Sequence, residues 1–279
     1  MATLPVKKIY LDTKFKRYDS ISTSNFKIDL PQTIKLPQNC ILQVDDINIP
    51  RVWYTVEQGV NDKLYFRLQL ANGGNSTDYI LQLEPRFYNT AQFKHEIVSK
   101  ITGLTNGAVT TGTIDDNTQT LAISVANLDI NFFTDEQLSD PLDGIAWGGS
   151  AYDKRNLNSG NELITNVVPN LVGNSQNPLI LYLNLTPVRN IYMKSPNLSS
   201  FNTIGCNGES TIIKKIPVNV PQNQMITASI TSGTDFIPAD NLTLKTIEIR
   251  LEDVNGNIIN LHNFNMSFSI IFDIMKSEQ

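Results

Sequence analysis

The side chains that most often perform chemistry are few in this chain, and their spacing forms no catalytic motif. Its two histidines stand apart, with His95 between Lys94 and Glu96 in a helical pattern and His262 in a polar turn. A metal site built on neighbouring β-strands needs several histidine and carboxylate ligands. One histidine in each half of the chain does not meet that need. The sequence therefore predicts two surface histidines and no metal site.

The candidate nucleophiles also lack their usual surroundings. Ser150 in GGSAY and Ser175 in GNSQN do not lie in the Gly-x-Ser-x-Gly turn that exposes a nucleophile. Cys40 and Cys206 form no Cys-x-x-Cys pair, and neither lies in an aromatic-flanked motif with a partner histidine. The state of the two thiols, free or paired with each other, stays open at this point.

Two adjacent acid pairs, Asp45-Asp46 and Asp115-Asp116, point to opposite faces if they lie in strands. They cannot act as one acid/base couple, and we expect a bulge and a turn in their place. DVNGN at Asp253 resembles the start of a calcium loop but lacks the distal glutamate, so a hairpin turn is expected. There is no glycine-rich phosphate loop. The sequence predicts no enzyme and no cofactor.

Aromatic side chains supply the remaining binding candidates. Trp53 and Tyr54 stand together in IPRVWYTV, and Trp147 and Tyr152 lie in a Gly-, Asn- and Ser-rich stretch at 138–177. Such rings stack on sugars in binding modules, or they pack in a core. Both interpretations remain for Trp53 and Tyr54, which directly follow a strand and a proline. The long polar stretch is typical of a functional or disordered loop.

The elements that must position these residues are mostly strands, because apolar side chains alternate with polar ones in many short runs. Beyond Asp45-Asp46 the apolar phase moves by one residue, which predicts a bulge or a bend between sheets. The runs with the clearest alternation are Phe26–Leu30, Cys40–Val44, Leu64–Leu70, Tyr79–Leu83, Leu179–Leu185, Ile247–Leu251 and Phe264–Ile274.

One segment has a helical period instead. Phe93, Ile97 and Ile101 are spaced four apart, Asn89 or Thr90 can cap the start, and Gly103 can supply a left-handed residue at the end. The pattern predicts one amphipathic helix at about 90–102. The fold prediction is all-β: a single jelly-roll sandwich at 25–63 and 179–279, an inserted β-rich subdomain at 64–178 with the helix, and an N-terminal arm at 1–24.

Charge and composition fit a surface that is buried against a partner, and they equally fit a nucleotide-biased genome. Charged residues make up 18% of the chain, below the quarter or so that is usual. The uncharged polar surface that results can be buried at low cost, although a nucleotide-biased genome gives the same composition. The net charge of −5 argues against sequence-specific or general nucleic-acid binding. Basic residues cluster in the arm, either as a solvated tail or as a contact to neighbours: Lys7, Lys8, Lys14, Lys16 and Arg17.

The start of the chain has no apolar signal-peptide core, and no stretch approaches the roughly twenty apolar residues of a membrane span. We therefore expect no membrane span and an intracellular, reducing setting.

Several segments together carry a family likeness. LDTKFKRYDSISTSNFKIDLP resembles the opening of minor capsid and penton proteins of virophages and Polinton-like viruses, and YILQLEPRFYNTAQFKHEIVSKITGL with TLAISV resembles their strand-helix-strand insertion. NIYMKSPNLSS, IIKKIPVNV and FNMSFSIIFDI are similar to their late strands. The stretch at 140–177 matches least.

The resemblance implies a single jelly-roll protein of the virion, assembled in the host cytoplasm, of which five copies close each icosahedral vertex. Its implied partners are itself as a homopentamer, the major capsid protein and other minor capsid proteins, with the N-terminal arm reaching towards the neighbours. The alternative function is a viral fibre head or a glycan-binding jelly-roll module, which would use Trp53, Tyr54, Trp147 and Tyr152.

Overall fold

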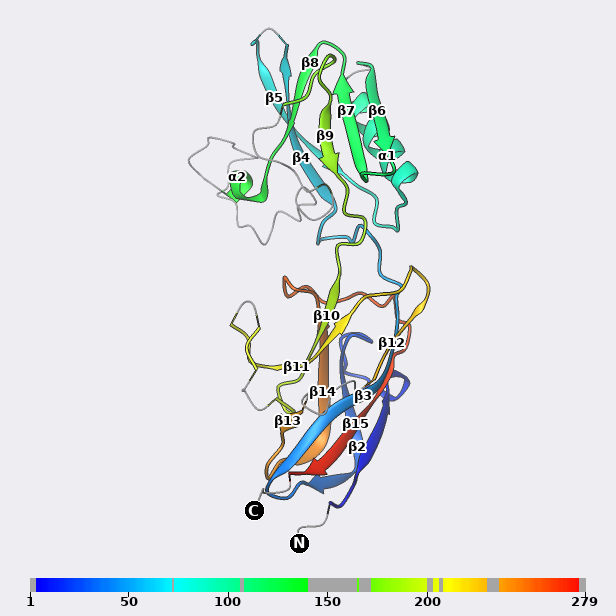
Figure 1. Ribbon diagram of the computed structural model, residues 1–279, viewed down its shortest axis with the longest axis vertical. Helices are drawn as coiled ribbons and strands as arrows, with labels where there is room; N and C mark the ends of the chain where they lie inside the picture. The colour runs from blue at the N-terminus through cyan, green and yellow to red at the C-terminus, as the bar shows by residue number, and fades with distance from the viewer. Residues whose placement is uncertain are drawn as a thin grey trace. The chain divides into compact units, whose positions relative to one another are not determined.

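The computed structural model describes residues 4–71, 73–105, 108–139, 165, 172–199, 203–205, 208–229 and 236–275. The chain divides into two compact units, of which one comprises residues 1–53 and 188–279 and the other residues 54–187 (Figure 1). The inserted unit thus begins ten residues earlier and ends nine residues later than the 64–178 expected from the alternation pattern. The fold is all-β, as predicted, and each unit has its own hydrophobic core.

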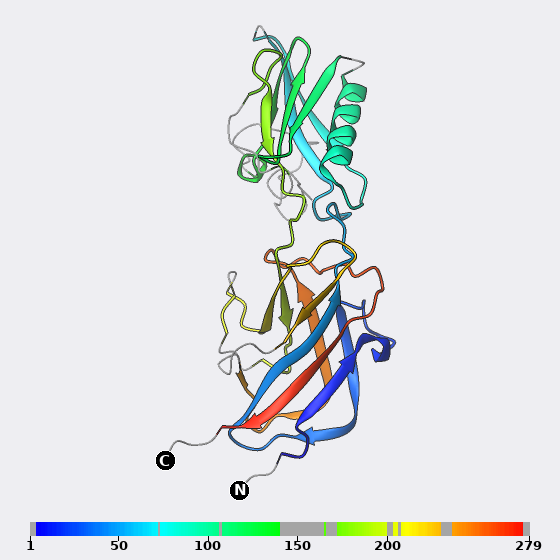
Figure 2. The ribbon, with the colours of Figure 1, turned by 45° about the vertical axis from the view of Figure 1, so that its right-hand side comes forward.

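The first unit is a sandwich of a five-stranded sheet and a four-stranded sheet, built from eight main strands and the short β13 (Ile237–Pro238) (Figure 2). One sheet has the order β1-β15-β3-β12, with β13 also pairing with β3, and the other has the order β11-β10-β14-β2. The eight strands are β1 (Lys8–Asp12), β2 (Asn25–Lys35), β3 (Cys40–Pro50), β10 (Asn190–Lys194), β11 (Ile212–Pro217), β12 (Met225–Ala228), β14 (Thr243–Glu252) and β15 (Ser267–Ile274).

The pairings of these eight strands are nested along the chain. The first strand pairs with the last (β1 with β15), the second with the seventh (β2 with β14), the third with the sixth (β3 with β12) and the fourth with the fifth (β10 with β11). All four pairs are antiparallel. This wrapped order is a jelly roll, and the inserted unit occupies the connection between its third and fourth strands.

Alternation of side chains explains why these strands form. Phe26, Ile28 and Leu30 of β2 are buried between the sheets, while the intervening residues are more exposed. The bulge expected at Asp45-Asp46 is confirmed: the register of β3 against β15 shifts there by one residue, and Asp46 has a φ of 48°. The extra residue keeps Val44 and Ile47 both in the core.

The N-terminal segment differs most from the expectation. Residues 1–24 were predicted to be an arm outside the sandwich, but Lys8–Asp12 form β1, which pairs with β15 over all five residues. η1, a 3-10 helix at Thr13–Phe15, follows directly. Leu11 belongs to the hydrophobic core of the sandwich. The jelly roll therefore begins at β1 and not at Asn25.

The inserted unit contains the third sheet, which has six strands in the order β5-β4-β8-β7-β6, with β9 also pairing with β7. Its strands are β4 (Lys63–Leu70), β5 (Ser76–Gln82), β6 (Thr110–Asp115), β7 (Thr120–Val125), β8 (Leu128–Phe132) and β9 (Leu179–Tyr182). β9 was expected in the jelly roll, because its alternation alone does not reveal which sheet it joins. It pairs with β7 from Leu179 to Tyr182 and buries Leu179 and Leu181 in the inserted unit.

α1 (Thr90–Leu104) covers one face of the inserted sheet (Figure 2). Asn89 is its N-cap, with Oδ1 accepting from the Gln92 amide at 2.8 Å, and Phe93, Ile97 and Ile101 are fully buried. The prediction that Gly103 adopts a left-handed conformation at the end of the helix is wrong, since Gly103 lies inside the helix and has no positive φ. The Thr105 amide and hydroxyl both donate to the Ile101 carbonyl at 3.0 Å, which ends the helix without a glycine. A short helix, α2 (Asp135–Ser139), follows β8.

Candidate assembly surface

The N-terminal segment, residues 4–24, contains all five predicted arm residues and is anchored at Thr13. The Thr13 amide donates to the Met266 carbonyl at 3.0 Å, and the Met266 amide donates back to Thr13 Oγ1 at 2.9 Å. Thr13 is fully buried. Asp12 caps η1 by accepting from the Lys14 amide at 2.8 Å. These bonds fix the position at which the chain leaves β1.

The connection from η1 to β2 is also fixed by hydrogen bonds. The Arg17 amide donates to the Lys27 carbonyl at 2.7 Å, and the Lys27 amide donates to Ser20 Oγ at 3.1 Å. Ser22 Oγ accepts from the Asn25 amide at 3.0 Å. Serines in this stretch therefore act as turn-forming acceptors, and residues 16–24 lie along the edge of β2.

The five basic residues of the segment divide into two sets. Lys8 forms ion pairs with Asp45 and Asp46, and the hydrogen bond to Asp46 is the main reason that the pKa of Lys8 is raised. Arg17 binds Asp19 through two nitrogens, at 2.9 and 3.0 Å. No ion pair to another described residue is formed by the remaining three, which are Lys7, Lys14 and Lys16.

Large apolar side chains lie exposed beside these lysines. Phe15 is 72% exposed, Tyr18 is 99% exposed and Ile21 is 84% exposed. Tyr10 on β1 is 74% exposed, with Lys8 Nζ 5.1 Å from its ring centroid. Exposed aromatic and apolar residues next to unpaired cations are typical of a protein-binding surface. We call residues 14–21 the docking segment.

Of the four aromatic residues predicted as sugar platforms, the structure describes Trp53 and Tyr54. Trp53 is only 4% exposed and belongs to the jelly-roll core, so it offers no surface platform. Trp53 lies three residues beyond the end of β3 and packs among the buried residues of that core. Tyr54 is half-buried. Trp147 and Tyr152 lie outside the described residues.

The candidate catalytic groups that the structure describes lie on different elements. His95 is exposed on α1, and the His262 amide donates to Asn260 Oδ1 at 2.9 Å in a left-handed turn. Burial raises the pKa of the Cys40 thiol to about 11, so the thiolate is disfavoured. Across the described ranges, no three His, Cys, Asp or Glu side chains lie close enough to hold a metal ion. Cys206 lies outside those ranges.

One charged cluster was missed by the sequence analysis. Lys194 of β10 lies 2.6 Å from Glu252 of β14 and 3.2 Å from Glu209. Burial lowers the pKa of Lys194, but the hydrogen bonds with the two glutamates outweigh that effect and leave the pKa raised. The alternation patterns of β10 and β14 predict that Lys194 and Glu252 lie in strands, but nothing in the sequence shows that the two strands are neighbours.

Within the described residues, no helix has the length and apolarity that a membrane crossing requires.

Comparisons with known proteins bear on this fold. No protein-family model matches the chain, and no curated protein sequence matches it. A solved structure does match, with a TM-score of 0.51 over 97% of this chain and 100% of the other, at 10% sequence identity. That structure is the mavirus penton protein. At this identity the likeness shows the fold, a jelly roll with an inserted unit, and the two chains correspond over their full lengths.

Proposed function

We propose that this protein is a structural capsid protein, a penton that forms homopentamers at icosahedral vertices and contacts the major capsid protein. The observation that carries the proposal is the full-length match to the mavirus penton protein, which includes both the jelly roll and the insertion. A likeness confined to the sandwich would fit many viral and cellular proteins. Virion localisation and the absence of enzymatic activity follow from this role.

The docking segment supports the proposal from the chain's own residues. A five-fold ring needs a heterologous interface, in which one surface of a subunit binds a different surface of the next. Phe15, Tyr18 and Ile21 provide exposed anchors of the kind that dominate interface energies. Because they extend from a connection fixed to β2, they pay little conformational entropy on binding.

Light scattering on the purified protein tests the proposal directly. We expect a species of five times the 31.2 kDa chain mass, or its formation when major capsid protein is added, and five-fold rings by electron microscopy. The triple variant Phe15→Asp, Tyr18→Asp and Ile21→Asp should remain folded, because all three side chains are exposed, and should fail to form rings. Met225→Asp, at a residue that is 49% exposed on β12, the strand at the opposite end of the sheet from β1, is the matched control.

A protein that stays monomeric at high concentration, alone and with major capsid protein, would contradict the proposal. If rings persist in the triple variant, the proposed pentamer stands, but the docking segment is not part of its interface.

A further inference from the structure

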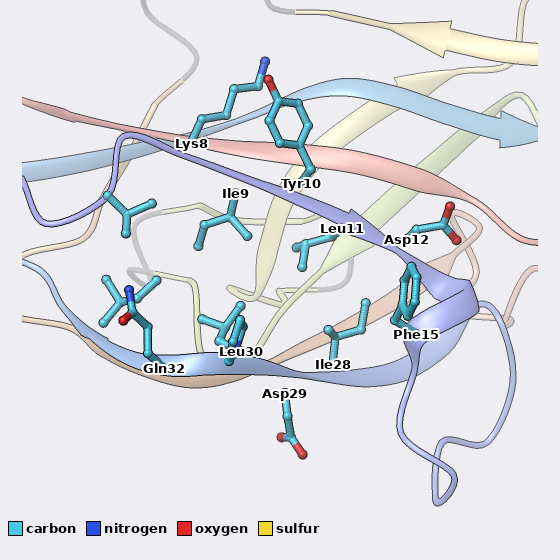
Figure 3. Close-up of a pocket in the computed structure, with 13 residues that line it drawn as sticks. Lys8, Ile9, Tyr10, Leu11, Asp12, Phe15, Ile28, Asp29, Leu30 and Gln32 are labelled. Atoms are coloured by element: carbon cyan, nitrogen blue, oxygen red, sulfur yellow. The ribbon is translucent and has the colours of Figure 1, made fainter.

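A groove of about 590 Å³ lies between β1 and β2, which are edge strands of the two jelly-roll sheets (Figure 3). Figure 3 shows Ile9 and Leu11 projecting from β1 toward Ile28 and Leu30 of β2, while Lys8 and Tyr10 project to the opposite side of β1. Phe15 closes one end of the groove. The two sheets thus leave a groove along this edge, lined mainly by apolar side chains that are themselves largely buried, such as Leu11, Ile28 and Leu30.

The backbone of β1 has a free hydrogen-bonding edge. Phe272 N donates to the Lys7 carbonyl at 2.8 Å and Thr13 N donates to Met266 at 3.0 Å, so residues 7, 9, 11 and 13 direct their backbone groups to β15. Lys8, Tyr10 and Asp12 must then direct their amides and carbonyls away from β15. Among the described strands, β1 pairs with β15 alone.

The edge of β2 is less suited to receive a strand. Its Lys27 carbonyl already accepts from the Arg17 amide, and Pro31 has no amide to donate. The register of β2 against β14 also jumps between Asp29 and Ile34, so this part of β2 departs from its sheet. An added strand would therefore pair with β1 and cover the apolar side chains of both strands.

Charge at the groove selects the partner. Lys7 follows the lining residue Val6, and Lys14 and Lys16 flank Phe15, so cations that form no ion pair with a described residue stand at both ends. Of the two lining carboxylates, Asp12 accepts from the Lys14 amide, and Asp29 points away from the groove and binds Arg17 at 3.5 Å (Figure 3). Lys8, the remaining lining cation, is neutralised by Asp45 and Asp46. The groove thus complements acidic groups at its two ends.

We propose that this groove binds an extended segment of another protein, with alternating apolar and acidic residues, as an added strand on β1. Main-chain hydrogen bonds to Lys8, Tyr10 and Asp12 would align the segment. Its apolar side chains fill the groove between Ile9 and Leu30, and its acidic residues meet Lys7 and Lys14. The inference rests on the proposed function, because a structural role in a capsid implies neighbouring proteins that would supply such a segment.

Fluorescence anisotropy with a labelled synthetic peptide of alternating valine and glutamate tests the proposal, with light scattering on the same samples. We expect saturable binding that weakens with added salt. The peptide with lysine in place of glutamate should not bind. Methylation of alternate peptide amides, on the face that pairs with β1, should weaken binding at least about tenfold, because it removes the donors of an added strand while keeping the side chains.

Two matched variants locate the site. Lys7→Glu with Lys14→Glu should weaken binding at least about tenfold, whereas Lys94→Glu with Lys215→Glu, which changes the net charge equally at distant lysines, should change it little. Equal weakening by both pairs, no effect of amide methylation, or no binding by the wild type at millimolar peptide would each overturn the proposal.

Self-association that Lys7→Glu alone abolishes, at a residue outside the docking segment, without peptide binding, would assign the groove to a second copy and also overturn the proposal. Ring formation is scored separately by electron microscopy. Rings without peptide binding therefore refute the groove alone, and peptide binding without rings refutes the proposed function alone.

Discussion

Nζ of Lys194 lies 2.6 Å from Oε2 of Glu252, and the two side chains are only 13% and 7% exposed. They join β10 to β14, adjacent strands in the middle of one jelly-roll sheet. A pair this buried is costly to break from one side, since Glu252 then keeps its desolvation penalty and retains only the longer ion pair with Arg250, at 3.4 Å.

Lys194→Met should therefore lower the free energy of unfolding by about 2–4 kcal/mol. Lys215→Met, at an exposed residue of the neighbouring β11, should change it by less than about 0.5 kcal/mol. Urea denaturation measures both. The double variant Lys194→Met with Glu252→Met should recover much of the loss, and a cycle with no coupling energy would contradict the pairing.

The same pair predicts a loss of stability at alkaline pH. The pKa of Lys194 is raised in the folded protein above its ordinary 10.5. The folded state therefore holds the proton more tightly than the unfolded state, so the contribution is complete below pH 10.5 and is lost as pH rises through the folded pKa. Denaturation at a series of pH values should show a shallower alkaline loss for Lys194→Met than for the wild type. Parallel curves would contradict the assignment.

β1 is expected to stabilise the jelly roll as a strand. Leu11→Ala should lower the free energy of unfolding by about 2–3 kcal/mol, because Leu11 is 5% exposed within the core. Tyr10→Ala, one residue earlier and 74% exposed, is the control and should have a small effect. If both changes leave the urea midpoint unaltered, residues 1–24 behave in solution as the arm that the sequence suggested.

The two units should lose stability separately. Phe93→Ala removes a fully buried ring from the core of the inserted unit and should cost that unit about 3–5 kcal/mol. Hydrogen exchange read by mass spectrometry should show faster exchange in β4 and β7, with β3 and β14 unchanged. The reciprocal variant Phe26→Ala should affect β3 and β14 and leave β4 and β7 protected. Uniform loss of protection in either variant would show one cooperative unit.

Local patterns in the sequence predicted the elements whose determinants are local. Phe26, Ile28 and Leu30 identified β2, and Asn89 with the four-residue spacing of Phe93 and Ile97 identified α1. The phase change at Asp45-Asp46 predicted a bulge that the structure contains.

The sequence did not predict elements whose determinants lie far along the chain. β1 has five residues and buries only Leu11, so its pattern is too short to recognise without β15, more than 250 residues away. β9 carries a clear alternation, but the choice between two sheets depends on its pairing with β7. The groove and the Lys194–Glu252 pair depend on the same long-range pairings, and they were missed for that reason.

The nested strand order determines when the sandwich can be completed during synthesis on the ribosome. β15 lies between β1 and β3 in its sheet, yet it is the last strand to be made. A nascent chain can complete the inserted unit, whose strands end at Tyr182, while the jelly roll still lacks a central strand. The closed sandwich thus arises only after translation has passed β15, so a surface that depends on both sheets is absent from an incomplete chain.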